Sequence, residues 1–179
     1  MKPIYKYLST KIKNSNIKAT NGTIKKIVKD ELDRLGHNAD LNHIDVSEVT
    51  NMDSLFSCFA MDLGPKYADL NPDISNWDVS NVTNMRYMFY VCENFNCDIS
   101  NWDVRNVETT AYMFEECKKF NQNISRWKVG NVKWMNEMFS GCKNFNQDIS
   151  SWDVNNVKDM GAMFYECPIK EEFKPKFNI

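Results

Sequence analysis

The sequence holds few of the residue types on which catalytic, phosphate-binding and metal sites depend. Its 179 residues include only two histidines and six glycines. Neither His37 nor His43 belongs to a repeated motif, the glycines form no phosphate-cradling loop, and no nucleophile stands with a recognisable base. No two cysteines have the C-x-x-C spacing of a metal site. We therefore expect a chain that is not an enzyme and that uses no cofactor and no metal.

Long apolar runs and a strong net charge are also lacking. No stretch approaches the length of a membrane span, and the start "MKPIYKYLSTKIKNS" lacks the uninterrupted apolar stretch of a secretory signal. The net charge of −2 gives no general attraction to nucleic acid or anionic membrane. The charge is uneven, because residues 1–36 hold nine of the 22 Lys and Arg but three of the 24 Asp and Glu. We interpret this basic start as a solvated arm or polar helix face, with a docking patch as the alternative.

The sequence does contain a 25-residue repeat. Four copies succeed one another without a gap, as in "WDVSNVTNMRYMF" at residues 77–89, and "IDVSEVTNMDSLF" at residues 44–56 is an earlier irregular copy. The first two copies are 33 residues apart, which indicates an insertion near residues 58–69. One such unit is too small to bury its own apolar residues, so we expect the units to stack in chain order.

Each unit reads as a strand followed by a short helix. The alternation in "WDV" is typical of a strand with one buried face. Met85, Met88, Phe89 and Cys92 then lie at the spacing of one helix face. The predicted fold class is an α/β repeat solenoid, with short parallel strands on one side and short helices on the other. Because strands pack more closely than helices, the strand side should be concave.

Both ends of the repeat should be covered. Residues 23–36 predict a helix that begins after Thr23 and ends before Gly36, and it should lie over the first unit. Residues 168–179 offer Ile169, Phe173 and Phe177 to the other end. The predicted organisation is a basic arm and capping helix over residues 1–39, five units over 40–167, and a second cap over 168–179.

The tryptophan and cysteine columns are predicted to be structural. Tryptophan and valine flank the aspartate of "WDV" and must face the same way, so we expect both in the core; the alternative is an outward platform for sugars or peptides. The cysteines should be buried thiols too far apart for disulfides. Repeated serines and asparagines should bond the turns and the neighbouring unit. The predicted core residues are Trp77, Trp102, Trp127, Trp152, Cys92, Cys117, Cys142 and Cys167.

The fourth unit of the array, the third of the regular copies, differs in charge. It carries Lys128 and Asn123 where the other regular copies have aspartate. Stacked carboxylates repel one another, so Lys128 between Asp103 and Asp153 should turn repulsion into attraction. The alternative is a small basic spot, formed with Arg105 and Arg126, that binds a partner.

Positions that vary between copies are the candidates for binding. Exposed aromatic residues and arginines are the types that anchor protein contacts. On the helix side, Trp134 is the one tryptophan out of phase and is expected to be exposed. Tyr87, Tyr90, Tyr112 and Tyr165 are similar candidates. On the concave side the candidates include Asn76, Asn101, Asp103, Arg105, Arg126 and Lys128.

The unit "FN-x-DIS-x-WDVSNVTNM-x-x-MF" resembles the BspA-like leucine-rich-repeat surface proteins, which share it with the mycoplasma lipoprotein repeat. The resemblance covers about residues 40–167. It implies a leucine-rich-repeat-like solenoid, a place at the cell surface and adhesin-like binding, with no catalytic residues. Together with the residues, it predicts a protein-binding module; glycan binding through aromatic residues and a purely structural scaffold are the alternatives.

Overall fold

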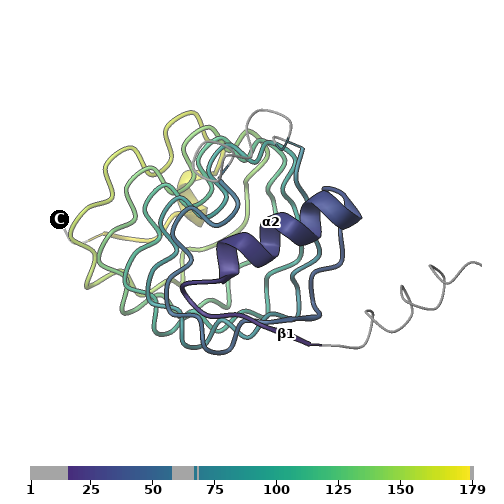
Figure 1. Cartoon of the computed structure of the whole chain (residues 1–179). Coiled ribbons are helices and arrows are strands. Elements are labelled where there is room, and N and C mark those ends of the chain that lie inside the picture. The colour runs from purple at the N-terminus through teal and green to yellow at the C-terminus, as the bar shows by residue number, and fades with distance from the viewer. Residues whose placement is uncertain (1–15, 58–66, 68, 178–179) are drawn as a thin grey trace, which may run out of the picture.

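The computed structural model describes residues 16–57, residue 67 and residues 69–177 (Figure 1). Strand β1 (Ile17–Lys18) is followed by helix α2 (Ile24–Leu35), strand β2 (Ile44–Asp45) and the 3₁₀ helix η2 (Glu171–Phe173). Strands β1 and β2 pair in parallel, with Ile17 opposite Ile44. The rest of the described chain consists of turns, bends and single bridges.

The predicted fold class is therefore wrong. An α/β leucine-rich-repeat-like solenoid needs a strand and a helix in each unit, but within the described residues the four regular units form neither. By secondary structure the fold is mostly irregular. The division into residues 1–39, 40–167 and 168–179 stays a prediction, and the first fifteen residues and most of the insertion lie outside the described residues.

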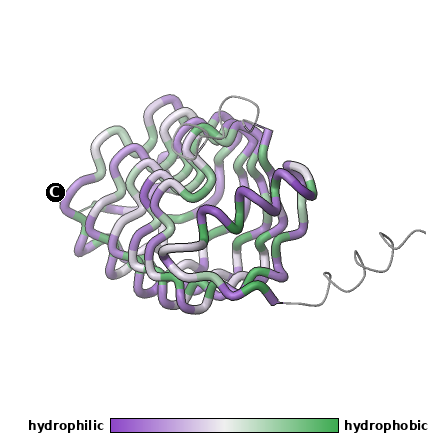
Figure 2. Tube along the Cα trace, viewed as in Figure 1, coloured by the Kyte–Doolittle hydropathy of each residue, from purple (hydrophilic) through white to green (hydrophobic). Residues whose placement is uncertain are grey.

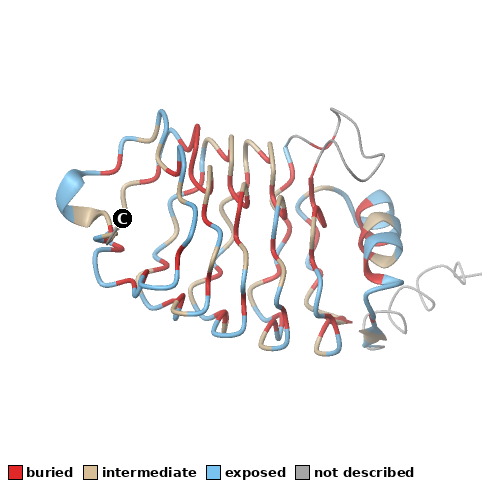
Figure 3. Ribbon diagram, turned by 90° about the vertical axis from the view of Figure 1, so that its left-hand side faces the viewer, coloured by how far each residue is buried: buried red, intermediate tan, exposed pale blue. Residues whose placement is uncertain are grey.

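The irregular chain nevertheless winds in successive coils (Figure 3). We number them 1 to 5 by the residue at the tryptophan position, which is Ile44, Trp77, Trp102, Trp127 and Trp152 in turn. Among the described residues, one single bridge joins Asp40 to Asp73, and the other four lie in the "VTN" part of the units rather than in "WDV". They join equivalent positions of neighbouring coils in parallel: Asn51 to Asn84, Asn84 to Thr109, Thr109 to Trp134 and Trp134 to Asp159.

The predicted helix of each unit is replaced by turns with left-handed residues. In coil 2, Tyr87 has φ 54° and Val91 has φ 61°, and a right-handed helix cannot continue through such residues. The residues buried by the apolar pattern, such as Met88 and Phe89, are still fully buried, so a different backbone satisfies the same pattern. The equivalent left-handed residues in the later coils are Tyr112, Glu116, Glu137, Gly141, Ala162 and Glu166.

These turns bond each coil to the next through the main chain. The N–H groups of Met85, Tyr87 and Phe89 donate to carbonyls of coil 3 at 3.0 Å each. In the other direction, the carbonyls of Asn84 and Arg86 accept N–H groups of coil 1 at 2.8 Å. The N–H groups that join these turns thus point toward the C-terminal coil. At that end, no hydrogen-bond partner among the described residues meets the N–H groups of Met160, Ala162, Phe164 and Glu166.

The same hydrogen bonds remove the reason for curvature. Without helices, the turn side of each coil bonds directly to the next coil. The strand-to-helix mismatch that predicted a concave face is absent, so we call the "WDV" side the loop edge instead.

The core contains a column of phenylalanine rings, one from each coil. The centroids of neighbouring rings are 5.4–5.8 Å apart, and the column is formed by Phe56, Phe89, Phe114, Phe139 and Phe164.

The four repeated tryptophans are in the core, as predicted. They are at most 5% exposed. Each indole Nε1 donates to a carbonyl of the preceding coil, as Trp127 does to Ile99 at 3.1 Å. The outward platform is therefore wrong.

In the part of the chain that the structure describes, no disulfide joins any of the five cysteines. Cys92, Cys117 and Cys142 are fully buried, and their sulfhydryls donate to phenylalanine carbonyls of the preceding coil at 3.0–3.1 Å. Cys167 is half-buried, with Phe145 O 3.6 Å from its sulfur. Burial raises the pKa of Cys142 well above its ordinary value, which keeps this thiol protonated. The predicted burial holds for Cys92, Cys117 and Cys142, whereas Cys167 is only partly buried.

Helix α2 lies over the first coil (Figures 1 and 3). Its flanking residues are Thr23 and Gly36, which confirms the predicted bounds. Its buried residues, among them Val28 and Leu32, pack against the core while polar residues cover the other face (Figure 2). At the opposite end the structure agrees with the prediction, since the core includes or contacts Ile169, Phe173 and Phe177.

Candidate protein-contact surface

The basic spot predicted on the loop edge stays a prediction, and the structure shows one of its three residues paired with a carboxylate. Arg105 pairs with Asp103 in its own turn, with Nε 2.8 Å from Oδ1. Arg126 and Lys128 are exposed, and neither has an ion pair within 4.0 Å in the part of the chain that the structure describes. Among the described residues, Lys128 therefore makes no direct ion pair with its aspartate neighbours, to which it was predicted to be attracted. The two remaining candidates, Asn76 and Asn101, are exposed single positions on neighbouring coils.

Asn123 has a clear structural role. The main-chain N–H and hydroxyl of Ser125 donate to Asn123 Oδ1 at 3.1 and 2.7 Å. Ser75 makes the same two bonds to Asp73, at 3.1 and 2.7 Å. The substitution keeps the turn and removes one negative charge.

A polar hollow of about 460 Å³ lies where the asparagine column meets the bridged segments. Its asparagines donate to carbonyls of the preceding coil, as Asn131 does to Arg105 at 2.7 Å. Lys133 and Glu108 pair across it at 2.8 Å. The polar groups of the hollow thus hold neighbouring coils together, which is the role predicted for the repeated asparagines.

On the turn side, Trp134 is 40% exposed, which confirms the prediction of an exposed ring. The Lys133 ammonium lies 5.9 Å from the ring centroid. Tyr165 is 64% exposed in coil 5. Both are single exposed rings, whereas the aromatic residues of coils 2 and 3 form a group.

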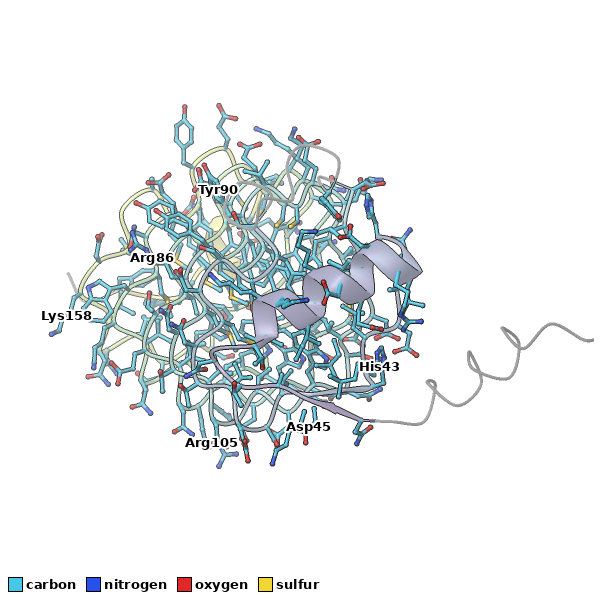
Figure 4. The ribbon with its side chains drawn as sticks, in the orientation of Figure 1. His43, Asp45, Arg86, Tyr90, Arg105 and Lys158 are labelled. Atoms are coloured by element: carbon cyan, nitrogen blue, oxygen red, sulfur yellow. The ribbon has the colours of Figure 1, made fainter. Side chains whose placement is uncertain are left out.

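Three tyrosines and an arginine gather on coils 2 and 3. The rings of Tyr87 and Tyr112 stack at 4.5 Å, and Tyr90 meets Tyr87 edge-on at 5.4 Å. The Arg86 guanidinium lies over this stack, 4.7 Å from the Tyr87 centroid and 5.7 Å from that of Tyr112. We call these four residues the tyrosine face. In Figure 4, Arg105 lies at the lower edge of the molecule, and Arg86 and Tyr90 lie above it.

The stack is a consequence of the repeat. Tyr87 and Tyr112 are 25 residues apart, and the Tyr87 N–H donates to the Ala111 carbonyl at 3.0 Å, which brings the two tyrosines side by side. Sequence reasoning named the three tyrosines but missed Arg86. The signal was present, because Arg86 precedes Tyr87 in the same turn.

Acidic residues continue the two tyrosine columns. One coil beyond Tyr112 lies Glu137, and one coil beyond Tyr90 lies Glu115. Burial, with the charges of Glu137 and Glu116, raises the pKa of Glu115 to about 7. Burial, and after it the charge of Glu115, raises the pKa of Tyr90. The tyrosine face therefore borders a region of negative potential.

The sequence matches one family model, which is described as "Mycoplasma protein of unknown function, DUF285", over residues 9–64 and 60–176. The chain belongs to this family. No curated protein and no solved structure matches the chain. The BspA-like leucine-rich-repeat resemblance is not among these matches.

In this member of the family, the tyrosine face is a described surface on which three aromatic rings contact one another. Among the described residues, no helix is both long and apolar enough to cross a bilayer. Half-buried tyrosines that are held in place by stacking offer a partner both apolar contact area and hydroxyl groups for hydrogen bonds.

Proposed function

We propose that this DUF285 family member is a non-catalytic protein-binding module and that the tyrosine face is its contact surface. The observation that carries the proposal is the stack of Tyr87 on Tyr112 under Arg86. Tyrosine and arginine are enriched among residues that dominate binding energy at interfaces. Because the rings are already fixed against each other, a partner would order them at little entropic cost.

The same criteria favour the tyrosine face over the loop edge. Arg105 is neutralised by Asp103, and among the described residues no aromatic ring lies under Arg126 or Lys128 in a cation–π contact. Glycan binding through stacked indoles is not proposed, since the four repeated tryptophans are buried. An adhesin-like role, which the resemblance implies, would be one form of protein binding.

The test compares variants in the capture and titration of a partner. Immobilised full chain is used to isolate binding proteins, and each is purified and titrated against the wild type and Tyr87→Ala/Tyr112→Ala. We expect the double variant to bind at least about 30-fold more weakly, or about 2 kcal/mol. Tyr165→Ala removes an exposed tyrosine from coil 5 and should change affinity by less than about twofold. Equal affinity of the double variant and the wild type would refute the proposal.

A further inference from the structure

The tyrosine face continues into carboxylates that lie next to it in fixed positions. The Val91 N–H donates to the Glu115 carbonyl at 2.9 Å, which places Glu115 one coil beyond Tyr90. The Tyr112 N–H donates to the Asn136 carbonyl at 2.9 Å, which places Glu137 one coil beyond Tyr112. Two adjacent columns therefore run from aromatic rings into carboxylates.

Among the described residues, no cation pairs directly with these carboxylates. In the described part of the chain, neither Glu115 nor Glu137 has an ion pair within 4.0 Å. The next carboxylate, Glu116, is 4.0 Å from Lys118, which already pairs with Glu93 at 2.6 Å. Above a pH of about 7, which is the pKa of Glu115, the border of the tyrosine face therefore carries an excess of negative charge.

The aromatic part of the surface already shows how it holds a cation. The Arg86 guanidinium lies over Tyr87 at a distance typical of cation–π contacts, and its terminal nitrogen is 3.3 Å from the Tyr87 hydroxyl. Tyr90 meets Tyr87 edge-on and continues the aromatic surface toward Glu115. A second guanidinium at this border would meet aromatic rings and carboxylates together.

We propose that the tyrosine face binds an arginine-rich segment of a partner protein, with a guanidinium held at the border between the rings and the carboxylates of Glu115 and Glu137. This inference rests on the proposed function and adds the chemistry of the partner. Arginine suits the site because its planar cation stacks on aromatic rings and bonds carboxylates in a bidentate manner. Anionic partners such as nucleic acid would be repelled by the same carboxylates.

The direct test uses a synthetic peptide of about twelve residues in which arginine alternates with serine. A matched peptide carries citrulline, which has nearly the shape of arginine without its charge. We expect the arginine peptide to bind the full chain saturably at low salt and the citrulline peptide to bind at least about tenfold more weakly. Equal binding of the two peptides, or no binding of either, would overturn the proposal.

Variants of the chain locate the site. Glu115→Gln/Glu137→Gln should weaken arginine-peptide binding at least about tenfold. Glu171→Gln/Glu172→Gln makes the same charge change on η2 and should alter binding by less than about twofold. Equal losses in both double variants would show mere charge attraction and contradict the proposal.

The same variants distinguish failure of the arginine-rich partner from failure of the proposed protein-binding function. A captured partner that is lost with Tyr87→Ala/Tyr112→Ala but kept with Glu115→Gln/Glu137→Gln would leave protein binding intact and refute the arginine-rich partner. A partner kept by both variants would refute the two proposals together.

Discussion

The indole Nε1 of Trp102 donates a hydrogen bond to the main-chain carbonyl of Ile74, 3.2 Å away in the preceding coil. Both residues are buried, so the bond joins two coils within the core. We expect Trp102→Phe to lower the free energy of unfolding by about 2–3 kcal/mol, because packing is lost and a buried carbonyl loses this donor.

Urea denaturation of the full chain measures this loss. Trp134→Phe is the matched control, since its ring is 40% exposed and the substitution should change stability by less than about 0.5 kcal/mol. Similar losses in the two variants would contradict the structural role of the buried indole.

Thr110 occupies a core position at which coils 2, 4 and 5 carry methionine. It is 1% exposed, and its Oγ1 has no hydrogen-bond partner among the described residues. Thr110→Val removes this unpaired hydroxyl while keeping the shape, and should raise the free energy of unfolding by about 1 kcal/mol. Thr109→Val should instead destabilise, because Thr109 Oγ1 accepts the Ala111 N–H at 3.3 Å. Thermal unfolding of both variants checks the opposite signs.

Ala162 has φ 53° in an exposed turn, a left-handed conformation that costs a residue with a Cβ about 1 kcal/mol. Ala162→Gly should therefore stabilise the chain by up to about 1 kcal/mol. Ala111→Gly, at a buried position outside the left-handed set, should destabilise it by about 0.5–1 kcal/mol or more. Calorimetric melting of the two variants distinguishes left-handed strain from a general effect of glycine.

The raised pKa of Glu115, about 7, makes stability depend on pH. Glutamate in an unfolded chain has a pKa of about 4.3. Between these values the folded chain binds more protons than the unfolded chain, so the free energy of unfolding falls as the pH rises. Glu115→Gln lacks this loss, and its stability relative to the wild type should increase from about pH 4.5 to about pH 7 and then level off.

Asp98→Asn is the control for this pH series. The hydroxyl and N–H of Ser100 lower the pKa of Asp98, so its stabilising contribution is complete above the unfolded value of about 3.9 and is lost as the pH falls below it. The stability of Asp98→Asn relative to the wild type should stay constant from about pH 5 to about pH 8. A parallel pH trend in both variants would contradict the assignment to Glu115.

The open end of the main-chain ladder predicts a difference in hydrogen exchange. The coil 4 N–H groups that donate to coil 5 at 2.8–2.9 Å are those of Met135, Glu137, Phe139 and Gly141. In the described chain no such acceptor meets their equivalents in coil 5, which are Met160, Ala162, Phe164 and Glu166. We expect the second set to exchange at least about 100-fold faster by NMR. Equal protection would show that another group covers this edge.

The repeat phase in the sequence predicted which units are neighbours and most of the buried residues, although Cys167, a predicted core residue, is only partly buried. The capping helix between Thr23 and Gly36 was also predictable, because its apolar stripe and its final glycine are local signals. The prediction failed from Met85 to Cys92. Apolar residues at i, i+3, i+4 and i+7 fit a helix and equally fit turns that return every fourth residue to left-handed φ.

The tyrosine face could be predicted only in part. Tyrosines were identified as candidates, but their contact depends on Tyr87 and Tyr112 being one coil apart on a closely stacked side. Helices in each unit would separate those coils too widely for stacked rings. The acidic border was missed for the same reason, since Glu115 and Glu137 become neighbours of the rings only through main-chain bonds between coils.

The amides that join the turns of neighbouring coils, such as those of Met85, Tyr87 and Phe89, point toward coil 5, so their peptide dipoles add instead of cancelling, as they do along a helix. The turn side is thus electrically polar along the length of the molecule, with its negative pole at coil 1 and its positive pole at the amides of coil 5. Each additional unit of this kind would lengthen the dipole, while the same kinds of main-chain groups would remain exposed at its two ends.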